Sequence, residues 1–309
     1  NVIGKIYAGI ADDMLTTTIM ATTAPKYLCP AMNTEMYNNP ITQRNLEGLR
    51  SLGYHIMDPA EGWLACGITG VGRLPEPEAI VEWLESKMFS TNELEGTTIL
   101  VTAGGTQENI DPVRYIGNRS SGKMGYAIAE QAVRMGAKVI LVSASTSLPV
   151  PSGVDFVSVD SAVSMQEAIE ARYNDVNVVI MAAAVSDFRV LHKSEQKIKK
   201  MVSMTLELVK NPDILQGLGS KKSHQILVGF AAETEHVIKY GQDKVARKNL
   251  DMLVANDVSK SNAGFNVDTN EGYFLYPDKE PKELPNMKKS DLARHILKEV
   301  INLVANRQS

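Results

Sequence analysis

The stretch TILVTAGGTQENIDPVRYIGNRSSGKMG, residues 98–125, decides the fold of the larger part of this 309-residue chain. An apolar run over residues 98–102 opens it and is typical of a buried strand in a parallel sheet. Glycines and a long loop follow, and the pattern over residues 122–135 predicts a helix that ends at Gly136. Such a helix start favours a bound anion, because the first amides of a helix have no intrahelical partner.

Two well-known glycine motifs fit this stretch poorly. The pattern G-x-G-x-x-G is absent, so an interpretation as a nicotinamide-dependent oxidoreductase lacks its dinucleotide fingerprint. Residues 117–123 match the first part of a P-loop, but Met124 stands where a P-loop needs Ser or Thr for magnesium. We instead predict that Gly104 and Gly105 let the backbone approach a ligand closely, since glycine has no Cβ atom. The alternative is a long solvated loop with one glycine for helix packing.

Strand and helix patterns alternate along the chain after this stretch. Apolar runs predict strands over residues 138–143, 177–183, 226–231 and 252–255, and a helix is predicted over about residues 235–250. This alternation predicts an α/β fold, Rossmann-like, with a parallel sheet and right-handed crossovers. Residues 268–272 are expected to form a hairpin turn, and residues 288–306 an amphipathic C-terminal helix.

The first 92 residues show a second α/β pattern. We predict helices over residues 1–25, 41–52 and 76–88, short strands over 27–30 and 54–57, and a glycine-rich loop over 62–73. The polar stretch at residues 90–96 is the expected boundary, which gives domains of residues 1–92 and 93–309. Asn1 and the residues after it have the pattern of a domain interior, so we expect further sequence upstream of residue 1.

Composition narrows the class of protein. The net charge of −4 and the pI near 5.8 argue against a general affinity for nucleic acid or an anionic membrane. No apolar run reaches the roughly 18 residues that a membrane span needs. The two cysteines, Cys29 and Cys66, form no C-x-x-C pair, so we expect a cytoplasmic protein. A local cluster of lysines can still bind a small anionic ligand within this acidic chain.

Small and charged residues follow the predicted strand over residues 177–183. Ala182 and Ala183 leave room for a flat ligand, and Asp187 is placed to hold a metal ion between phosphates. The structural alternative for Asp187 is a helix or turn cap. Lys197 lies in a lysine-rich segment, which we interpret either as a solvated face or as a lid over phosphate.

Several later residues have both a structural and a functional interpretation. Lys244 and Lys248 lie four residues apart on one helical face, where like charges repel unless solvent or an anion offsets them. Asn211 and Pro212 are typical of a helix start, with Asn as the cap and Pro in the first turn. Phe230 ends a predicted strand, and core packing is its default role.

The order of these motifs resembles a known enzyme family. The motifs TAGGT (102–106), DPVRYIGN (111–118), SSGKMG (120–125), AAAVSD (182–187), KIKK (197–200), VKNPD (209–213), GFAAET (229–234) and RKNLD (247–251) are similar to those of phosphopantothenate–cysteine ligase. Upstream, PAMNTEMY (30–37) and ACG (65–67) look like the flavin-dependent phosphopantothenoylcysteine decarboxylase. The resemblance therefore implies a bacterial bifunctional family of coenzyme A biosynthesis, with a flavodoxin-like decarboxylase part followed by the Rossmann-like ligase domain.

The resemblance implies two reactions and their ligands. The ligase uses CTP to convert the carboxylate of 4'-phosphopantothenate into an acyl-cytidylate, and the nitrogen of cysteine then displaces CMP. The decarboxylase uses FMN to oxidise the cysteine thiol, which eases the loss of its carboxylate. The family also implies magnesium or manganese, a ligase dimer and decarboxylase trimer contacts.

The resemblance also implies residue roles. Asn118 would hold the acyl-cytidylate with Arg114 beside it, Asn33 would grip the decarboxylase substrate, and Cys66 would donate a proton. Asn1 would lie near the flavin. Implied CTP contacts are Gly104, Gly105, Met181, Ala182, Ala183, Asp187, Lys197, Asn211, Pro212, Asp213, Ile214, Phe230, Lys244 and Lys248, with Asp187 also a magnesium ligand.

One departure from the family and one rival interpretation follow. The decarboxylase family has a catalytic His and a flavin-phosphate loop before the position of Asn1, and His55 comes too late in the order to replace that His. We therefore expect only a partial decarboxylase domain in residues 1–92. Besides the nicotinamide oxidoreductase, a non-catalytic flavin-binding or assembly module stays the alternative.

Overall fold

The computed structural model describes residues 1–64, 67, 69–88, 91–199, 202–233, 236–257 and 269–308. The chain divides into two compact units, Asn1–Ser90 and Thr91–Ser309. This division lies close to the domain boundary that the sequence predicts. The backbone amides of Thr91 and Leu94 donate hydrogen bonds of 2.9 Å to the carbonyls of Arg134 and Met135. These bonds explain why residues 91–96 of the polar boundary stretch belong to the second unit.

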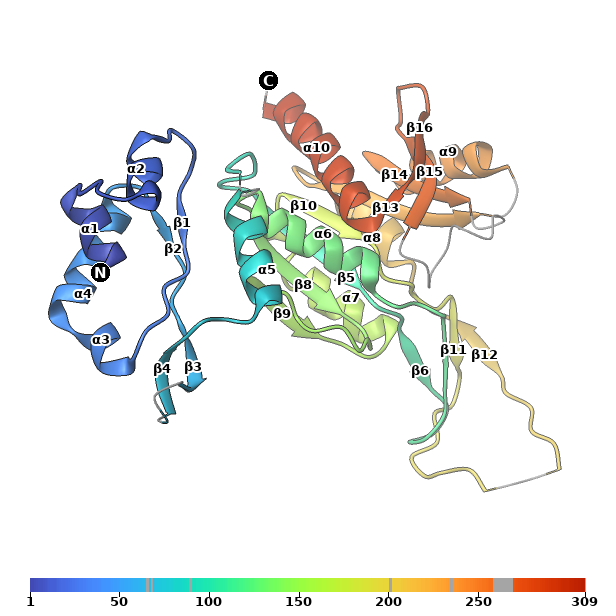
Figure 1. Ribbon diagram of the computed structural model, residues 1–309. Coiled ribbons are helices and arrows are strands. Elements are labelled where there is room, and N and C mark those ends of the chain that lie inside the picture. The colour runs from blue at the N-terminus through green and yellow to red at the C-terminus, as the bar shows by residue number, and fades with distance from the viewer. Residues whose placement is uncertain are drawn as a thin grey trace. The chain divides into compact units, whose positions relative to one another are not determined.

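The second unit is built on an eight-stranded sheet (Figure 1). In spatial order its strands are β16 (Lys282–Lys288), β15 (Thr269–Leu275), β14 (Met252–Asp257), β13 (Ile226–Glu233), β10 (Val178–Met181), β5 (Thr98–Ala103), β8 (Lys138–Ser143) and β9 (Val154–Ser158). Neighbours from β14 to β9 are parallel, whereas β15 and β16 pair antiparallel. The predicted α/β fold with a mainly parallel sheet is confirmed.

The order of the strands creates a switch point between β5 and β10. From β5 the chain adds β8 and β9 on one side, and it then returns to add β10, β13 and β14 on the other. The connections therefore leave the carboxyl ends of β5 and β10 in opposite directions. In open α/β sheets, ligands bind in the crevice outside the carboxyl ends of the strands at such a point.

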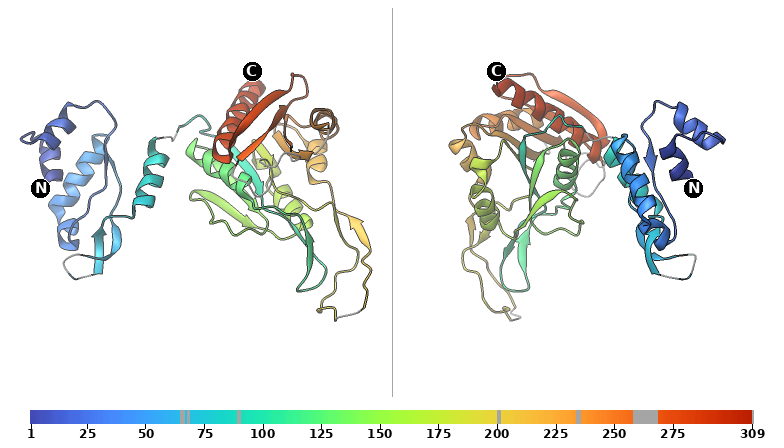
Figure 2. Two further views of the ribbon diagram at one scale, coloured as in Figure 1. Left: turned by 45° about the vertical axis from the view of Figure 1, so that its right-hand side comes forward. Right: turned by 90° about the vertical axis from the view of Figure 1, so that its left-hand side faces the viewer.

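Helices cover both faces of this sheet. Helices α6 (Lys123–Arg134) and α10 (Lys289–Gln308) lie side by side on one face (Figures 1 and 2). The other face packs against α7 (Ala162–Glu170), α8 (Ile214–Lys221), α9 (Val237–Arg247) and the short 3-10 helix η1 (Tyr173–Asp175). Successive strand residues alternate between the two faces, so Ile99 and Val101 pack with α6 and α10 while Leu100 packs on the opposite side.

Two antiparallel strand pairs extend from the loops after β5 and β10. Strand β6 (Gln107–Asn109) pairs with β7 (Tyr115–Gly117), and β11 (Phe188–Val190) pairs with β12 (Leu208–Lys210). The β6 strand lies close to β11, and Figure 1 shows both beside β12. The long loops on either side of the switch point are therefore folded against each other.

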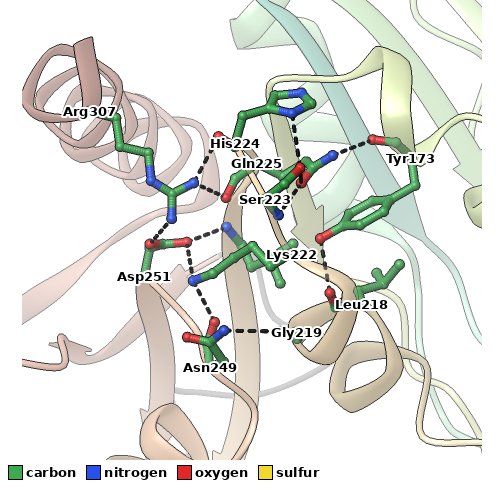
Figure 3. A network of polar contacts seen from close by, with 11 residues as sticks. Tyr173, Leu218, Gly219, Lys222, Ser223, His224, Gln225, Asn249, Asp251 and Arg307 are labelled. Carbon is green, nitrogen blue, oxygen red and sulfur yellow. Dashed lines mark hydrogen bonds and ion pairs between the residues drawn. The ribbon is translucent and has the colours of Figure 1, made fainter.

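The C-terminal helix is fastened to the sheet by a polar network (Figure 3). Arg307 in the last turn of α10 donates to the carbonyls of His224, at 2.7 Å, and Gln225, and to Oδ1 of Asp251 at 3.0 Å. The second carboxylate oxygen of Asp251 accepts from the amide of Leu227 at 2.7 Å and from Nζ of Lys222 at 3.2 Å. The network lies at the amino ends of β13 and β14, so this part of the RKNLD motif is structural.

The first unit contains short strands and five described helices. These are α1 (Val2–Ala8), α2 (Met14–Ala21), α3 (Thr34–Asn38), α4 (Pro40–Ser51) and α5 (Pro77–Met88), with β1 (Tyr27–Leu28) parallel to β2 (His55–Ile56) and β3 (Ala60–Trp63) antiparallel to β4 (Thr69–Arg73). The single helix predicted over residues 1–25 is wrong, because α1 ends before Gly9 in a left-handed conformation and Asp13 caps α2. The loop predicted over residues 62–73 is also wrong, since much of it belongs to β3 and β4.

Two predictions in the second unit are wrong as well. Residues 269–272, expected in a turn, lie within β15, while Asp268 lies outside the described residues. Helix α8 is capped by Asp213, whose carboxylate accepts from the amide of Gln216 at 3.1 Å, and not by Asn211. Strand β9 and helix α7 were not predicted; β9 is a partly exposed edge strand without a continuous apolar run.

Candidate functional site

A cavity of about 630 Å³ lies at the switch point and extends past the carboxyl ends of β13 and β14. Its lining comes from the loop and first turn of α6 (residues 118–124), the segment after β10 (182–185 and Asp187), the end of β13 (230–232), Lys244 of α9, Asn256 of β14, Asn270 of β15 and Lys289 of α10. The elements that build the sheet thus bring together residues that lie far apart in the sequence.

The cavity is basic although the chain is acidic. Its described lining contains Arg119, Lys123, Lys244 and Lys289 but a single acidic residue, Asp187. The whole chain, by contrast, has a net charge of −4. The first turn of α6 adds positive potential at the same place, because the positive end of the helix dipole lies there. A polyanionic ligand therefore finds a favourable field here.

Asn118 is held at the mouth of the switch point. Its Nδ2 donates a hydrogen bond of 3.1 Å to the carbonyl of Val185, in the segment that follows β10. The side-chain amide carries a second N–H and an acceptor oxygen, which can serve a ligand. The loop after β5 and the loop after β10 therefore meet at this residue, on the wall of the cavity.

Gly104 and Gly105 each lie against another segment of protein backbone, and their predicted approach to a ligand stays a prediction. A Cβ atom on Gly104 would lie 2.6 Å from the carbonyl oxygen of Ala144, and one on Gly105 would lie 2.9 Å from that of Asn118. Ala184 donates to the carbonyl of Gly104 at 2.9 Å, and neither glycine lines the cavity. The close approach is between protein segments, so these glycines shape the wall behind the cavity.

Asp187 lines the cavity and is positioned by Asn211. The backbone amide of Asn211 donates to the carbonyl of Asp187 at 2.8 Å, and its Nδ2 donates to the carbonyl of Ser186 at 2.8 Å. Arg189 donates in turn to Oδ1 of Asn211 at 3.0 Å. Asn211 therefore braces the turn that carries Asp187 and does not itself line the cavity.

The remaining predicted nucleotide contacts divide into two groups. Ala182, Ala183, Phe230 and Lys244 line the cavity. The others stay predictions that the structure places outside the described lining: Met181, Lys197, Pro212, Asp213, Ile214 and Lys248.

Lys248 and Asp213 form an ion pair in the structure. The ammonium of Lys248 lies 2.9 Å from the carboxylate of Asp213, which also caps α8. Burial alone would raise the pKa of Asp213, but hydrogen bonds from Lys248 and from the amide of Gln216 lower it below its ordinary value. This ion pair joins the end of α9 to the start of α8, so the predicted basic helix face is only partly directed to the cavity.

Lys289, Asn256 and Asn270 are cavity residues that the sequence reasoning missed. Lys289 is 8% exposed and opens α10, where a cation is unfavourable for the helix dipole. Asn270 donates to Oδ1 of Asn256 at 3.0 Å, and its own buried Oδ1 has no hydrogen-bond partner among the described residues. A lysine at a helix start is a signal for Lys289, because a structural role alone does not favour it, and Asn256 directly follows the strand predicted over residues 252–255.

In the first unit, Asn33 lies on a loop that packs against β4. Its Oδ1 accepts from the amide of Glu35 at 2.9 Å and caps α3. The neighbouring amide of Met32 donates to the carbonyl of Gly72 at 2.9 Å. Asn1 is exposed at the start of α1. Cys66 lies outside the described residues.

Metal and membrane features are limited among the described residues. That part of the chain contains no group of three or more His, Cys, Asp and Glu side chains that could hold a metal ion. Asp187 is a single carboxylate on the cavity wall, so a metal ion there would depend on ligand oxygens as well. None of the helices in the described ranges is both long and apolar enough to span a membrane.

Fold and cavity together define an α/β protein with a basic cavity at a topological switch point. Residues 94–304 match the family described as the DNA/pantothenate metabolism flavoprotein C-terminal domain, and residues 1–89 match the flavoprotein family. The chain belongs to the family of bifunctional coenzyme A biosynthesis proteins.

Relatives and solved structures agree with this membership. The coenzyme A biosynthesis bifunctional protein CoaBC of Bacillus subtilis strain 168 is 50% identical over 307 residues, which are 98% of this chain and 76% of that protein. The CoaBC protein of Escherichia coli K12 is 44% identical over 306 residues, 97% of this chain and 75% of that protein. A crystal structure of the C-terminal domain of a CoaBC protein is 44% identical, with a TM-score of 0.61, and covers 70% of this chain and 100% of that one.

Proposed function

We propose that the second unit is a phosphopantothenate–cysteine ligase that uses CTP. The observation that carries this proposal is the basic cavity, where Asn118, Asp187, Lys244 and Lys289 gather at the carboxyl edge of the sheet. The family membership of residues 94–304 supports it. The nucleotide and 4'-phosphopantothenate are both polyanions, and their reaction requires that their phosphates be held together against mutual repulsion.

The reaction runs in two displacements. A carboxylate oxygen of 4'-phosphopantothenate attacks the α-phosphorus of CTP, and pyrophosphate leaves with the electron pair of the broken P–O bond. The amine of cysteine then attacks the acyl carbon, loses a proton, and CMP leaves. The chief contributions of the protein are orientation and electrostatic stabilisation, because negative charge develops on oxygen in both steps.

The cavity residues take distinct parts in these steps. Lys244 and Lys289 offset phosphate charge from two sides of the cavity. The Nδ2 group of Asn118 orients the acyl-cytidylate, since one of its hydrogens is free of the bond to Val185. The small side chains of Ala182 and Ala183 leave space for the nucleotide at the end of β10.

A divalent ion fits this arrangement if the substrate supplies most of its ligands. Magnesium in phosphoryl-transfer sites is commonly bound by one or two carboxylates and by phosphate oxygens and waters. Asp187 would supply the carboxylate, and the ion would withdraw charge from the triphosphate.

We infer that the first unit is the C-terminal part of a flavodoxin-like decarboxylase domain that uses FMN. Its match to the flavoprotein family supports this inference. Asn33 would grip the carboxylate of phosphopantothenoylcysteine, because it lies on a loop tied to β4. When bound, FMN supplies the oxidation of the thiol. A flavin-binding module without catalytic activity is the alternative, and flavin absorbance without release of carbon dioxide would identify it.

One experiment tests the ligase most directly. The full chain is incubated with 4'-phosphopantothenate, cysteine and either CTP, ATP, GTP or UTP, and pyrophosphate is measured. We expect sustained release of pyrophosphate that requires both 4'-phosphopantothenate and cysteine. The release should be fastest with CTP. No release with any nucleotide, together with fluorescence evidence of NADH binding, would favour the oxidoreductase instead.

Assembly and location follow the same proposal. We infer a cytoplasmic homo-oligomer with ligase dimers and decarboxylase trimer contacts, as the family resemblance implies. Light scattering coupled to size-exclusion chromatography measures the mass of the assembly, and a monomer at micromolar concentration would contradict this inference.

A further inference from the structure

Asp111 is a buried carboxylate in the turn between β6 and β7. Its side chain is 0% exposed and accepts hydrogen bonds on both oxygens. Oδ1 accepts from the backbone amides of Val113, at 2.8 Å, and Arg114, at 2.9 Å. Oδ2 accepts from the guanidinium of Arg114 and from the backbone amide of Ile198 at 3.1 Å. The bond to Ile198 joins positions 87 residues apart in the sequence.

Arg114 also binds the backbone of Ile198. Its Nη2 donates to the carbonyl of Ile198 at 3.0 Å, so Asp111 and Arg114 together hold both polar groups of that residue. A second bond of 2.9 Å, from the amide of Ser194 to the carbonyl of Ile110, ties the start of the same segment to the turn. The lysine-bearing segment 194–199 is therefore fixed to the β6–β7 turn at two points.

The ionised form of Asp111 favours these hydrogen bonds. The hydrogen bonds from the Arg114 guanidinium hold the pKa of Asp111 well below its usual range, although burial opposes this shift. The carboxylate therefore stays ionised at neutral pH and keeps its acceptors available. Hydrogen bonds to a charged acceptor are stronger than those between neutral groups.

This arrangement changes what Arg114 and Lys197 can do. Arg114 is expected beside Asn118. In this structure its guanidinium donates hydrogen bonds to the carboxylate of Asp111 and the carbonyl of Ile198. Lys197 is exposed and directly precedes the gripped residue, so its place depends on the grip. Holding a flexible chain before a ligand arrives lowers the entropy lost on binding.

We propose that Asp111 is a positioning residue, which with Arg114 clamps the backbone of Ile198 and thereby sets the place of Lys197 for a nucleoside triphosphate. The proposal rests on the proposed ligase function, because that function supplies the polyanion that Lys197 meets. Asp111 touches no substrate and acts only through the segment 194–199.

A double-mutant cycle on the full chain tests the clamp. Asp111→Asn keeps the shape of the side chain but removes its charge and turns one acceptor into a donor. We expect the KM for CTP to rise about tenfold in D111N and in K197A, with a smaller change in kcat. The double variant D111N/K197A should be no worse than K197A, because the clamp acts through Lys197.

Asp251→Asn is the matched control. Like Asp111, Asp251 is a carboxylate that pairs with an arginine and a backbone amide, but it is only partly buried and lies at the opposite end of the sheet. D251N should lower the melting temperature and leave the KM for CTP unchanged. The clamp is overturned if the effects of D111N and K197A multiply, if D111N leaves the KM unchanged, or if D251N shifts it equally.

A readout without catalysis separates this proposal from the ligase itself. Trypsin cleavage after Lys197 and Lys199, followed by mass spectrometry, reports how often the segment leaves its place. We expect D111N to be cleaved there several times faster than the wild type under native conditions, while D251N is not. Equal cleavage of D111N and wild type overturns the clamp even if ligation proceeds. A wild type that is inactive with every nucleotide refutes only the ligase.

Discussion

Lys288 and Lys289 are adjacent residues in very different surroundings. Lys288 is exposed at the end of β16, whereas Lys289 is buried at the start of α10 and lines the cavity. We expect Lys289→Gln to raise the KM for CTP or 4'-phosphopantothenate about tenfold, because a buried cation that meets phosphate is lost. Initial rates with each substrate varied in turn identify which one. Lys288→Gln is the control, and equal effects of the two variants would refute the assignment.

In the proposed mechanism, Asn118 orients the acyl-cytidylate that forms in the first displacement and reacts in the second. Asn118→Asp replaces a donor with a charged acceptor that faces the carbonyl of Val185 and an anionic intermediate. We expect the acyl-cytidylate to accumulate while product formation falls about a hundredfold, since an oriented donor is removed. Quenched reactions separated by chromatography measure both species. Asn174→Asp, at an exposed site in η1, should behave like the wild type. Unimpaired ligation by N118D would remove Asn118 from the mechanism.

Some of the cavity residues could be predicted from the sequence because they follow strands of a parallel sheet. Asn118, Ala182 and Asp187 follow predicted strands, and the carboxyl ends of parallel strands meet at one edge of a sheet. Asn270 escaped this reasoning because β15 runs antiparallel and brings its beginning to that edge. Lys289 escaped it because its place depends on how α10 packs beside α6. That Asn270 and Lys289 line the cavity therefore depends on the tertiary fold.

Helix α9 separates two lysines that the sequence places on one face. Lys244 lines the cavity, while Lys248 at the helix end pairs with Asp213. We therefore expect Lys244→Ala to raise the KM for CTP about tenfold with little change in stability. Lys248→Ala should lower the stability of the α8–α9 contact by roughly 1 kcal/mol and affect KM less. Steady-state kinetics and urea unfolding measure the two quantities, and the reverse pattern would contradict the structure.

The β6–β7 turn should show a defined response to pH. The pKa of Asp111 in the folded protein lies below its ordinary value of 3.8, because Arg114 and backbone amides bind the carboxylate. Its contribution to stability is therefore fully present above about pH 4 and is lost as the pH falls through the lowered value. We expect the gap in melting temperature between wild type and D111N to be constant near neutrality and to narrow below about pH 4. A gap that widens in acid would contradict this sign.

Elements were predictable where local pattern and tertiary environment agree. The strands β5 and β8 are continuous apolar runs, and both were predicted at nearly the observed bounds. The segment TNEGYFL has Asn and Gly, which are typical of a turn, yet it is strand β15. Gly272 is needed there because a Cβ atom would collide with the carbonyl of Ala255 on β14. Neighbouring strands override the local preference, as they also do at the glycines of β4.

On the scale of the whole second unit, the cavity and the network around Arg307 lie at opposite ends of one sheet. The cavity lies at the carboxyl ends of β10, β13 and β14, and the Arg307–Asp251 network lies at the amino ends of β13 and β14 (Figure 3). This separation follows from parallel strands, because their carboxyl ends all open on one edge. Residues of the Arg307–Asp251 network can therefore be substituted without changing the lining of the cavity.

Arg307 provides the test of this separation. Arg307→Ala removes the donors to two carbonyls and to Asp251, and it leaves that carboxylate with Lys222 as its remaining side-chain partner among the described residues. We expect a loss of roughly 2 kcal/mol in the stability of the second unit, since the network is only partly shielded from water. Lys298→Ala, at an exposed site of the same helix, should change stability by less than about 0.5 kcal/mol. Thermal unfolding measures both variants, while their KM for CTP should equal that of the wild type. A change in KM with R307A at temperatures where it is fully folded would show that the two ends of the sheet are coupled.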